Sequence, residues 1–330
     1  TMKKNKTIRF AAALSLAVIM AAATVSCDKK SQSTSTSGLT RVACDQSFEN
    51  IMQQEVEVFE YIYPNASIMP AYLDEQACID SLLNMGRVNT IVVTRQLTDK
   101  EKKYLKDHKK NVKESKIAVD AIALISNPQN DMDEPLTRRE LVDILTGKIT
   151  RWDQLGPSKM GKIDVIFEHQ NSSTVKYMRD SLLRGAQFGP NVYAQKTARD
   201  VFKVVSENRD ALGVIGVSWI SADLKGRELD TKELAASLEQ NDTTARDFNE
   251  AVKVIAVRND DALKAYKPYQ AYIFDGSYPL YRSIYMITTA PGGSLGHGFY
   301  SFVTGFQGQK LIQMTGILPA TVRPRMVNVN

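Results

Sequence analysis

Short apolar runs and stretches of helical spacing alternate along the first part of the chain. The runs at residues 40–43, 67–72 and 89–93 each predict a β-strand. Residues 48–62 and 75–85, which lie between these runs, carry apolar side chains at helical spacing. This order of strands and helices predicts a parallel sheet whose ligand-binding loops follow the strand ends.

The alternation continues through the middle of the chain. Residues 117–125 form a long, almost uninterrupted apolar segment, and we expect it to be a strand that crosses between two domains. Thr137 and Glu140 have the spacing of a capping box, so we expect a helix to begin there and to stop at Gly147. Residues 212–217 predict a strand in which glycines permit close backbone approach.

A hydroxyl-rich run joins the predicted strand at residues 163–167 to the helical pattern at residues 175–183. It reads Glu168-His169-Gln170-Asn171-Ser172-Ser173-Thr174. Ser and Thr at a helix start bring unpaired backbone N–H groups, side-chain hydroxyls and the positive end of the helix dipole to one point, which suits an oxyanion. The same residue types also cap helices for purely structural reasons, so that alternative stays open.

The start of the chain has the pattern of a bacterial export signal. Basic residues precede an apolar stretch at residues 10–25, and small residues then lead to Cys27. This stretch is short for a membrane-spanning helix, so we expect residues 1–26 to be a cleaved signal peptide and Cys27 to carry a lipid. Residues 27–38 would form a flexible polar tether between the lipid and the folded chain.

Charge and the small number of reactive residues exclude several classes of function. Without the expected signal peptide the net charge falls from +5 to +1, which argues against a nucleic-acid surface. His108, His169 and His297 lack metal-ligand spacing, so we expect neither a metal nor another cofactor. Cys44 and Cys78 would form a disulfide or remain as buried free thiols.

Several short motifs, each present once, follow one another along most of the chain. They are Leu136-Thr137, Glu140-Leu141, Ile144-Leu145, Gly147-Lys148-Ile149 and Trp152, the strand at residues 212–217, Tyr278-Pro279-Leu280 with residues 284–287, and Gln307-Gly308-Gln309 with Gly316 and Pro319. In this order they resemble the periplasmic phosphate-binding protein (PstS-like) family of type II solute-binding proteins of ABC transporters. The resemblance covers about residues 39–320.

The resemblance implies an α/β fold of the type II periplasmic binding protein class. Two mixed-sheet lobes would be joined by a two-segment hinge, with the ligand cleft between them. Lobe 1 would comprise residues 39–125 and 276–330, and lobe 2 would comprise residues 126–275. Closure would be a hinge motion near residues 126–128 and 276–279.

The resemblance also implies an anion site that is divided between the two lobes. The ligand positions of the family correspond here to Ser47, Phe48 (through its backbone), Thr94, Arg95, Asn171 (which would shape the turn), Ser172, Ser173 and Thr174. Hydroxyls, N–H groups and an arginine able to grip two oxygens at once suit a tetrahedral oxyanion. Taken alone, Arg95 could equally form a surface ion pair with Asp99.

The chain departs from the family pattern just before the hydroxyl-rich turn. Many relatives place an arginine and an aspartate there, where this chain has Glu168 and Gln170. Monohydrogen phosphate carries a proton that sulfate lacks at neutral pH, so a buried carboxylate acceptor selects phosphate. Asp45, Asp74 and Glu168 are the candidates for this acceptor, although Glu168 could equally repel an anion or pair with a lysine.

We therefore predict a monomeric, non-catalytic protein of the periplasm-facing membrane or cell envelope. It would be anchored through lipid on Cys27 and would capture inorganic phosphate for an ABC permease. The alternative is a clamp-fold lipoprotein that senses, binds a partner or binds another oxyanion without phosphate uptake. A hydrolase or transferase that uses Ser172 or Ser173 with His169 as base is disfavoured, because no G-x-S-x-G nucleophile elbow surrounds them.

Overall fold

The computed structural model describes residues 33–84, 86–221, 231–238 and 248–321. The predicted signal peptide, Cys27 and the first part of the predicted tether lie outside these residues. Within the described part of the chain, no helix is long and apolar enough to cross a membrane.

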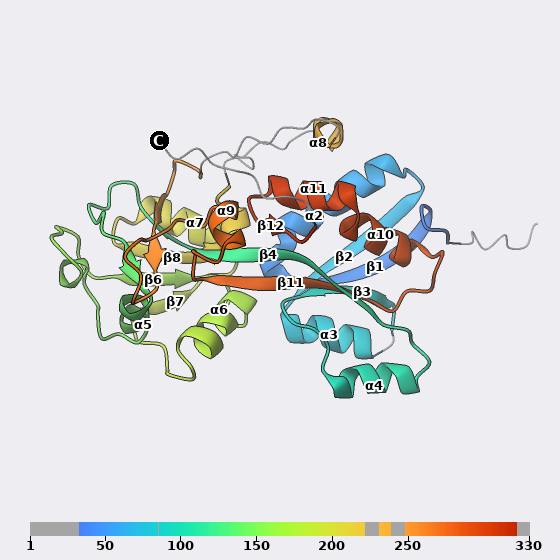
Figure 1. Cartoon of the computed structure of the whole chain (residues 1–330), viewed down its shortest axis with the longest axis horizontal. Coiled ribbons are helices and arrows are strands. Elements are labelled where there is room, and N and C mark those ends of the chain that lie inside the picture. The colour runs from blue at the N-terminus through green and yellow to red at the C-terminus, as the bar shows by residue number, and fades with distance from the viewer. Residues whose placement is uncertain (1–32, 85, 222–230, 239–247, 322–330) are drawn as a thin grey trace, which may run out of the picture. The chain divides into compact units, whose positions relative to one another are not determined.

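A mixed β-sheet with helices on both faces forms the body of the described chain (Figure 1). Its strands run in the order β2-β1-β3-β11-β4-β8-β6-β7, and β9 and β12 also pair with β4. The strands are β1 (Gly38–Asp45), β2 (Ala66–Leu73), β3 (Val88–Val93), β4 (Lys113–Ser126), β6 (Asp164–Phe167), β7 (Val192–Ala194), β8 (Ala211–Gly216), β9 (Lys253–Ile255), β11 (Tyr281–Thr288) and β12 (Leu318–Pro319). A separate short pair joins β5 (Leu136–Thr137) to β10 (Val257–Arg258).

The helices connect these strands and cover the sheet. They are α2 (Glu49–Ile62), α3 (Glu75–Leu83), α4 (Asp99–Asp107), α5 (Arg138–Leu145), α6 (Ser173–Tyr177), α7 (Ala198–Glu207), α8 (Thr231–Ser237), α9 (Gln270–Phe274), α10 (Leu295–Thr304) and α11 (Phe306–Met314). Short 3₁₀ turns are η1 (Gln46–Phe48), η2 (Trp152–Gln154) and η4 (Val217–Trp219), and a π-helical turn, η3 (Met178–Leu182), extends α6.

Two groups of parallel strands make up most of the sheet. In the first half-sheet β1 pairs in parallel with both β2 and β3, as the predicted strand–helix alternation requires. In the second half-sheet β6 pairs in parallel with both β7 and β8. Because parallel strands share the direction of their carboxyl ends, the loops after β1, β2 and β3 lie at one edge, and so do the loops after β6 and β8.

Two long antiparallel strands lie between the half-sheets. The predicted apolar strand is β4, whose first part pairs with β11 and whose last residues, 122–126, pair with β8. The returning strand β11 in turn pairs with β3. These two strands lie side by side across the middle of the molecule in Figure 1. The chain thus passes between the half-sheets more than once.

Local signals in the sequence account for several element boundaries. The capping box of Thr137 and Glu140 is present at the start of α5, and Gly147 follows this helix with a positive φ of 77°. Gly213 in β8 lies so close to its neighbours that an added Cβ would be 2.7 Å from the side chains of Ile125 and Val205. Both the capping-box prediction and the prediction of close backbone approach in this strand are confirmed.

The structure also bears on the predictions for the two cysteines and for the fold class. Cys44 and Cys78 are buried and free, so the free-thiol alternative describes them and the disulfide does not. The α/β fold with a mixed sheet is confirmed. The boundaries of the two predicted lobes, residues 39–125 with 276–330 and residues 126–275, stay predictions.

Candidate functional site

The hydroxyls of two distant loops converge on one carboxylate oxygen. Ser47, in η1 after β1, donates to Oε1 of Glu168 at 2.7 Å, and Thr174 donates to the same oxygen at 2.5 Å. The hydroxyl of Ser173 lies 3.2 Å from that of Ser47. All four side chains are buried. We call the hydroxyls of Ser47, Ser173 and Thr174 the hydroxyl cluster. The structure therefore brings together hydroxyl residues that were predicted from both parts of the chain.

Helix-start geometry positions these hydroxyls. The carboxylate of Asp45 accepts a hydrogen bond from the Ser47 amide at 2.9 Å and so begins η1. Ser172 caps α6, because its hydroxyl accepts from the Val175 amide at 3.1 Å. Ser172 therefore has a capping role, and its role as a ligand stays a prediction, whereas the hydroxyl cluster uses the two residues that follow it. Asn171 lies exposed in the preceding turn.

A buried ion pair adjoins the hydroxyl cluster and was not predicted as part of the site. Arg282 of β11 donates to Oδ2 of Asp120 in β4 at 3.1 and 3.2 Å, and its Nη1 donates to the Ser173 hydroxyl at 2.7 Å. Its guanidinium lies 4.8 Å from the ring centre of Phe48. The lone charge of Asp120 in the apolar segment was the available signal in the sequence, because buried charges require partners.

Carboxylates outnumber cations in this buried region. Asp45, Asp120 and Glu168 are all at most 2% exposed, and Arg282 lies among them at 6%. Burial raises the pKa of Asp45 to about 6, and although Arg282 opposes this rise, the charge of Glu168 reinforces it. Burial raises the pKa of Asp120 to about 6 for the same reason, again against Arg282.

Two carboxylate oxygens in this region have no hydrogen-bond donor among the described residues. They are Oδ2 of Asp45 and Oδ1 of Asp120. A buried acceptor that is left unpaired is costly, so a ligand that carries its own O–H groups would be favoured here. The arrangement can hold an oxyanion that is also a hydrogen-bond donor.

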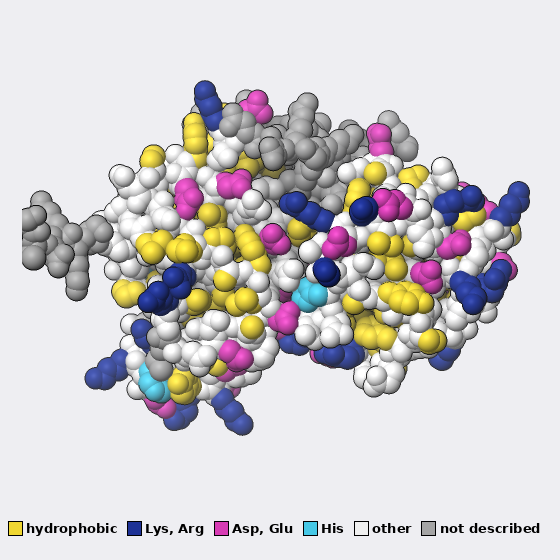
Figure 2. Space-filling view, turned by 180° about the vertical axis from the view of Figure 1, so that it is seen from behind, with side chains coloured by type: hydrophobic (Ala, Val, Ile, Leu, Met, Phe, Trp, Pro, Cys, Tyr) yellow, Lys and Arg dark blue, Asp and Glu magenta, His cyan; other side chains and the backbone are white. Residues whose placement is uncertain are grey.

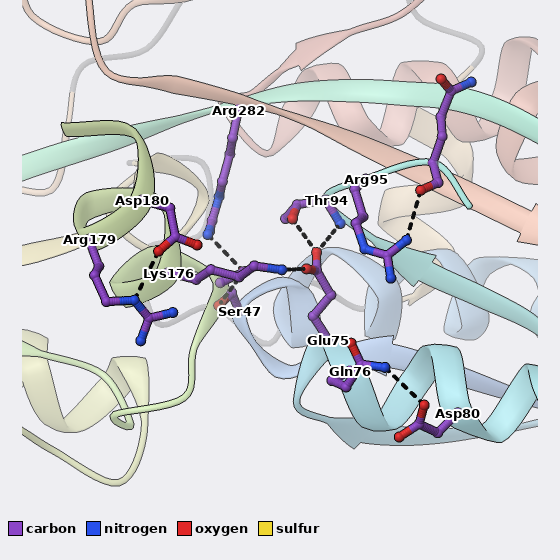
Figure 3. Close-up of polar contacts among 12 residues, drawn as sticks. Ser47, Glu75, Gln76, Asp80, Thr94, Arg95, Lys176, Arg179, Asp180 and Arg282 are labelled. Carbon is purple, nitrogen blue, oxygen red and sulfur yellow. Dashed lines mark hydrogen bonds and ion pairs between the residues drawn. The ribbon is translucent and has the colours of Figure 1, made fainter. Parts of the chain in front are cut away.

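A second set of contacts, which we call the rim contacts, joins the loops after β2 and β6. Lys176 of α6 extends to Oε1 of Glu75 at 2.5 Å, and Oε2 of Glu75 accepts from both the amide and the hydroxyl of Thr94 (Figure 3). His169 Nδ1 lies 3.2 Å from Oδ1 of Asp74. Figure 2 shows acidic and basic side chains gathered with a histidine near the middle of the face opposite to that in Figure 1.

Ion pairing governs the ionisation of Glu75. Burial alone would raise its pKa, but the hydrogen bonds from Lys176 and Thr94 outweigh burial and hold the pKa below its usual range. Glu75 is therefore an anion that already has its partners. It accepts hydrogen bonds from the Thr94 amide and hydroxyl, which were predicted to bind the ligand.

Arg95 lies outside the hydroxyl cluster. Its guanidinium donates to both oxygens of Glu101, at 2.9 Å each. It also donates to the backbone oxygen of Gln96. Arg95 thus forms an ion pair with Glu101 and not with Asp99, and its role as a ligand stays a prediction. This pairing raises the pKa of Arg95.

The fold and the site together define a class of protein. A mixed α/β sheet whose two half-sheets bring hydroxyl-bearing helix starts together, beside a buried arginine of β11, is the architecture of a type II periplasmic binding protein. Residues 29–305 of the chain match the family described as a PBP superfamily domain. The chain belongs to this family.

Sequence relatives point in the same direction. The chain is 27% identical over 213 residues to the "Phosphate-binding protein PstS" of Staphylococcus saprophyticus, a match that covers 64% of this chain and 57% of that protein. It is 23% identical over 298 residues to the protein of the same name from Pseudomonas aeruginosa, with 85% and 82% covered. The resemblance to the PstS-like family is confirmed.

Solved structures share the fold. A substrate-binding protein from Clostridium perfringens with bound phosphate superposes with a TM-score of 0.65 at 21% identity and covers 86% of this chain and 100% of its own. An ABC-type phosphate transport receptor from Vibrio cholerae gives a TM-score of 0.59 at 21% identity, with 84% and 99% covered. These likenesses confirm the predicted fold class.

Proposed function

We propose that this chain is a solute-binding protein that captures inorganic phosphate outside the cytoplasm and delivers it to an ABC permease. Its family is one of substrate-binding proteins, and its named relatives are phosphate-binding proteins. The observation that carries the proposal is the meeting of the Ser47, Ser173 and Thr174 hydroxyls with the Arg282 guanidinium in one buried region. Hydroxyls and a guanidinium are the donors that an oxyanion needs.

The protons of phosphate give a role to the unpaired acceptors. In our proposal the anionic oxygens accept from the hydroxyl cluster and Arg282, while the single P–OH group of monohydrogen phosphate donates to one of the two unpaired carboxylates, Asp45 or Asp120. Of the three acceptors predicted from sequence, Asp45 is the best supported, because its Oδ2 has no donor whereas Asp74 lies beside His169. Sulfate has no proton to offer at neutral pH and would face these carboxylates directly.

The other predicted ligands would require side chains to exchange partners. Thr94 would have to leave Glu75, and Arg95 would have to leave Glu101. The backbone amide of Phe48 remains a predicted ligand beside Ser47. We therefore expect the hydroxyl cluster and Arg282 to contribute more to binding than Thr94 or Arg95 does.

The proposal also includes export of the protein and its attachment to a membrane through a lipid on Cys27. The sequence pattern at residues 1–26 and Cys27 supports export and lipid attachment, and a monomer is the simplest state for a clamp that presents its ligand to a permease. Intact-mass measurement of the exported protein and of Cys27→Ala tests the lipid. Loss of the acyl mass in the variant is expected. A wild-type chain that retains residues 1–26 would contradict the proposal.

Calorimetric titration tests the ligand. The purified protein, freed of any ligand carried over from expression, is titrated at neutral pH with phosphate, sulfate, molybdate and citrate. We expect saturable binding of phosphate and rejection of sulfate. Binding of another oxyanion in preference to phosphate would overturn the phosphate assignment but retain the clamp.

One observation favours the second function, which is sensing or partner binding without phosphate uptake. Glu168 occupies hydroxyl donors that an oxyanion would need, and the buried carboxylates exceed the cations. A clamp-fold protein used for sensing or for binding a partner would retain such contacts without taking up phosphate. The absence of measurable binding of every oxyanion in the titration would favour this function.

A further inference from the structure

Glu168 accepts the hydroxyl donors of both sides of the proposed site. Its Oε1 accepts from the hydroxyls of Ser47 and Thr174 at 2.7 and 2.5 Å, and these two residues belong to loops that follow different half-sheets. The side chain is 2% exposed. One carboxylate oxygen thus receives donors from both sides of the proposed site.

We propose that Glu168 is an internal anion that ties the loop after β1 to the loop after β6, and that an incoming oxyanion binds by displacing it. The inference rests on the proposed function and adds a residue that sets affinity. It differs from the prediction that Glu168 accepts a proton from the ligand, because here the carboxylate and the ligand use the same two hydroxyl donors.

Hydrogen-bond capacity makes the two anions exclusive. Each hydroxyl has one hydrogen to donate, so Ser47 and Thr174 cannot serve Glu168 and a ligand oxygen together. Two anions side by side in a buried region would also repel each other, since Arg282 is already shared with Asp120. Ligand affinity in the wild-type protein is therefore reduced by the free energy of releasing Glu168.

The rim contacts provide a contrast within the same structure. Lys176 and Glu75 also join the two half-sheets, but their ion pair uses none of the hydroxyls of the hydroxyl cluster. A bound anion can coexist with that pair. The geometry thus separates one link that competes with the ligand from one that is compatible with it.

The test compares Glu168→Gln and Glu168→Ala with the wild-type protein in calorimetric titrations with inorganic phosphate. Gln keeps an acceptor of the same shape and removes the charge, so we expect phosphate to bind at least about tenfold more tightly than to wild type, which corresponds to ~1.4 kcal/mol. Glu140→Gln is the matched control, because Gln also serves at this position of a capping box and the residue lies in α5. Unchanged affinity is expected for it.

Weaker or unchanged phosphate binding by Glu168→Gln would overturn the inference. Weaker binding would make Glu168 a group that the ligand needs, and unchanged binding would make it a structural residue. Thermal unfolding of each variant shows whether it has folded, and the near-isosteric Gln variant keeps the test valid if the Ala variant does not fold.

A second readout needs no ligand. The indole of Trp219, in η4 after β8, donates to the backbone oxygen of Ser47 at 3.0 Å, so its fluorescence reports contact between the same two sides. The other tryptophan, Trp152, is fully buried elsewhere and contributes a constant signal. In phosphate-free Glu168→Ala we expect a red shift and stronger acrylamide quenching.

The two readouts separate failure of the inference from failure of the proposed function. If neither wild type nor Glu168→Gln binds phosphate, the proposed function fails, and the Trp219 signal still reports whether Glu168 ties the loops. An unshifted Trp219 emission spectrum in folded Glu168→Ala would contradict the proposal that Glu168 links the loop after β1 to the loop after β6.

Discussion

Arg282 and Asp120 show how a single buried pair serves two requirements. Their ion pair satisfies two charges that are each no more than 6% exposed, and the same guanidinium reaches the Ser173 hydroxyl. Buried ion pairs add little net stability compared with apolar residues of similar size, but removal of one partner is strongly destabilising. Stability and anion binding can therefore be separated by substitution.

Arg282→Met is expected to lower the free energy of unfolding by about 3–5 kcal/mol, because it leaves the Asp120 carboxylate buried and unpaired. Urea unfolding measures this loss. The double variant Arg282→Met with Asp120→Leu should recover most of the stability without recovering phosphate binding in a titration. Wild-type phosphate affinity in the double variant would remove Arg282 from the proposed site.

The pKa of Asp45 leads to a prediction about pH. Because burial raises it to about 6 from an ordinary value of 3.8, the folded protein binds this proton more tightly than the unfolded chain does. The resulting stability is fully present below about pH 4 and is lost as the pH rises through about 6. Asp45→Asn removes this contribution, so its unfolding free energy should change less than that of wild type between about pH 5 and pH 7.5.

Urea unfolding of both proteins at the two pH values makes the comparison. Asp120, whose pKa is raised to about 6 in the same way, keeps part of the dependence in the Asp45 variant. An identical pH dependence in wild type and Asp45→Asn would show that Asp45 does not carry this proton in the folded protein.

At the scale of elements, strand β8 depends on a residue without a side chain. A Cβ at Gly213 would lie 2.7 Å from Ile125 of the neighbouring strand and 2.7 Å from Val205 of α7. Gly213→Ala should therefore cost about 1–3 kcal/mol through overpacking, as measured by urea unfolding. Gly86→Ala is the control, since nothing lies within 4 Å of its added Cβ, and it should be neutral or slightly stabilising. Equal effects of the two would contradict this packing argument.

At the scale of the whole molecule, the links between the half-sheets determine how readily a ligand can engage both sides. Lys176 joins Glu75 without using the hydroxyl cluster, so it favours the arrangement in which the two sides meet. Lys176→Met is expected to weaken phosphate binding by up to roughly fivefold, or ~1 kcal/mol, because the lysine side chain is 43% exposed and its ion pair is partly screened.

Calorimetric titration measures this change. Lys148→Met, which breaks an ion pair with Asp143 that uses none of the hydroxyls of the hydroxyl cluster, is the control and should bind phosphate as wild type does. The expected direction is opposite to that for Glu168→Gln, because one link coexists with the ligand and the other competes with it. Tighter binding by Lys176→Met would contradict this distinction.

The sequence by itself determined the elements and their class. Apolar periodicity located β1 to β3 and the intervening helices, and the capping box and Gly147 bounded α5, because these signals act between residues close together in the chain. The hydroxyl-rich run after β6 was also evident, since Ser and Thr at a helix start cap the helix and also offer hydroxyl donors.

Only the tertiary structure decided which charges meet. Arg282 and Asp120 lie 162 positions apart, and Ser47 and Glu168 lie 121 apart, so no local pattern could pair them. Thr94 and Glu75 lie 19 positions apart. Arg95 and Glu101 lie only six apart, but the sequence did not distinguish Glu101 from Asp99 as the partner. Hydroxyl and charged groups carry no mark of their partners in the sequence, and strand order and register bring them within reach.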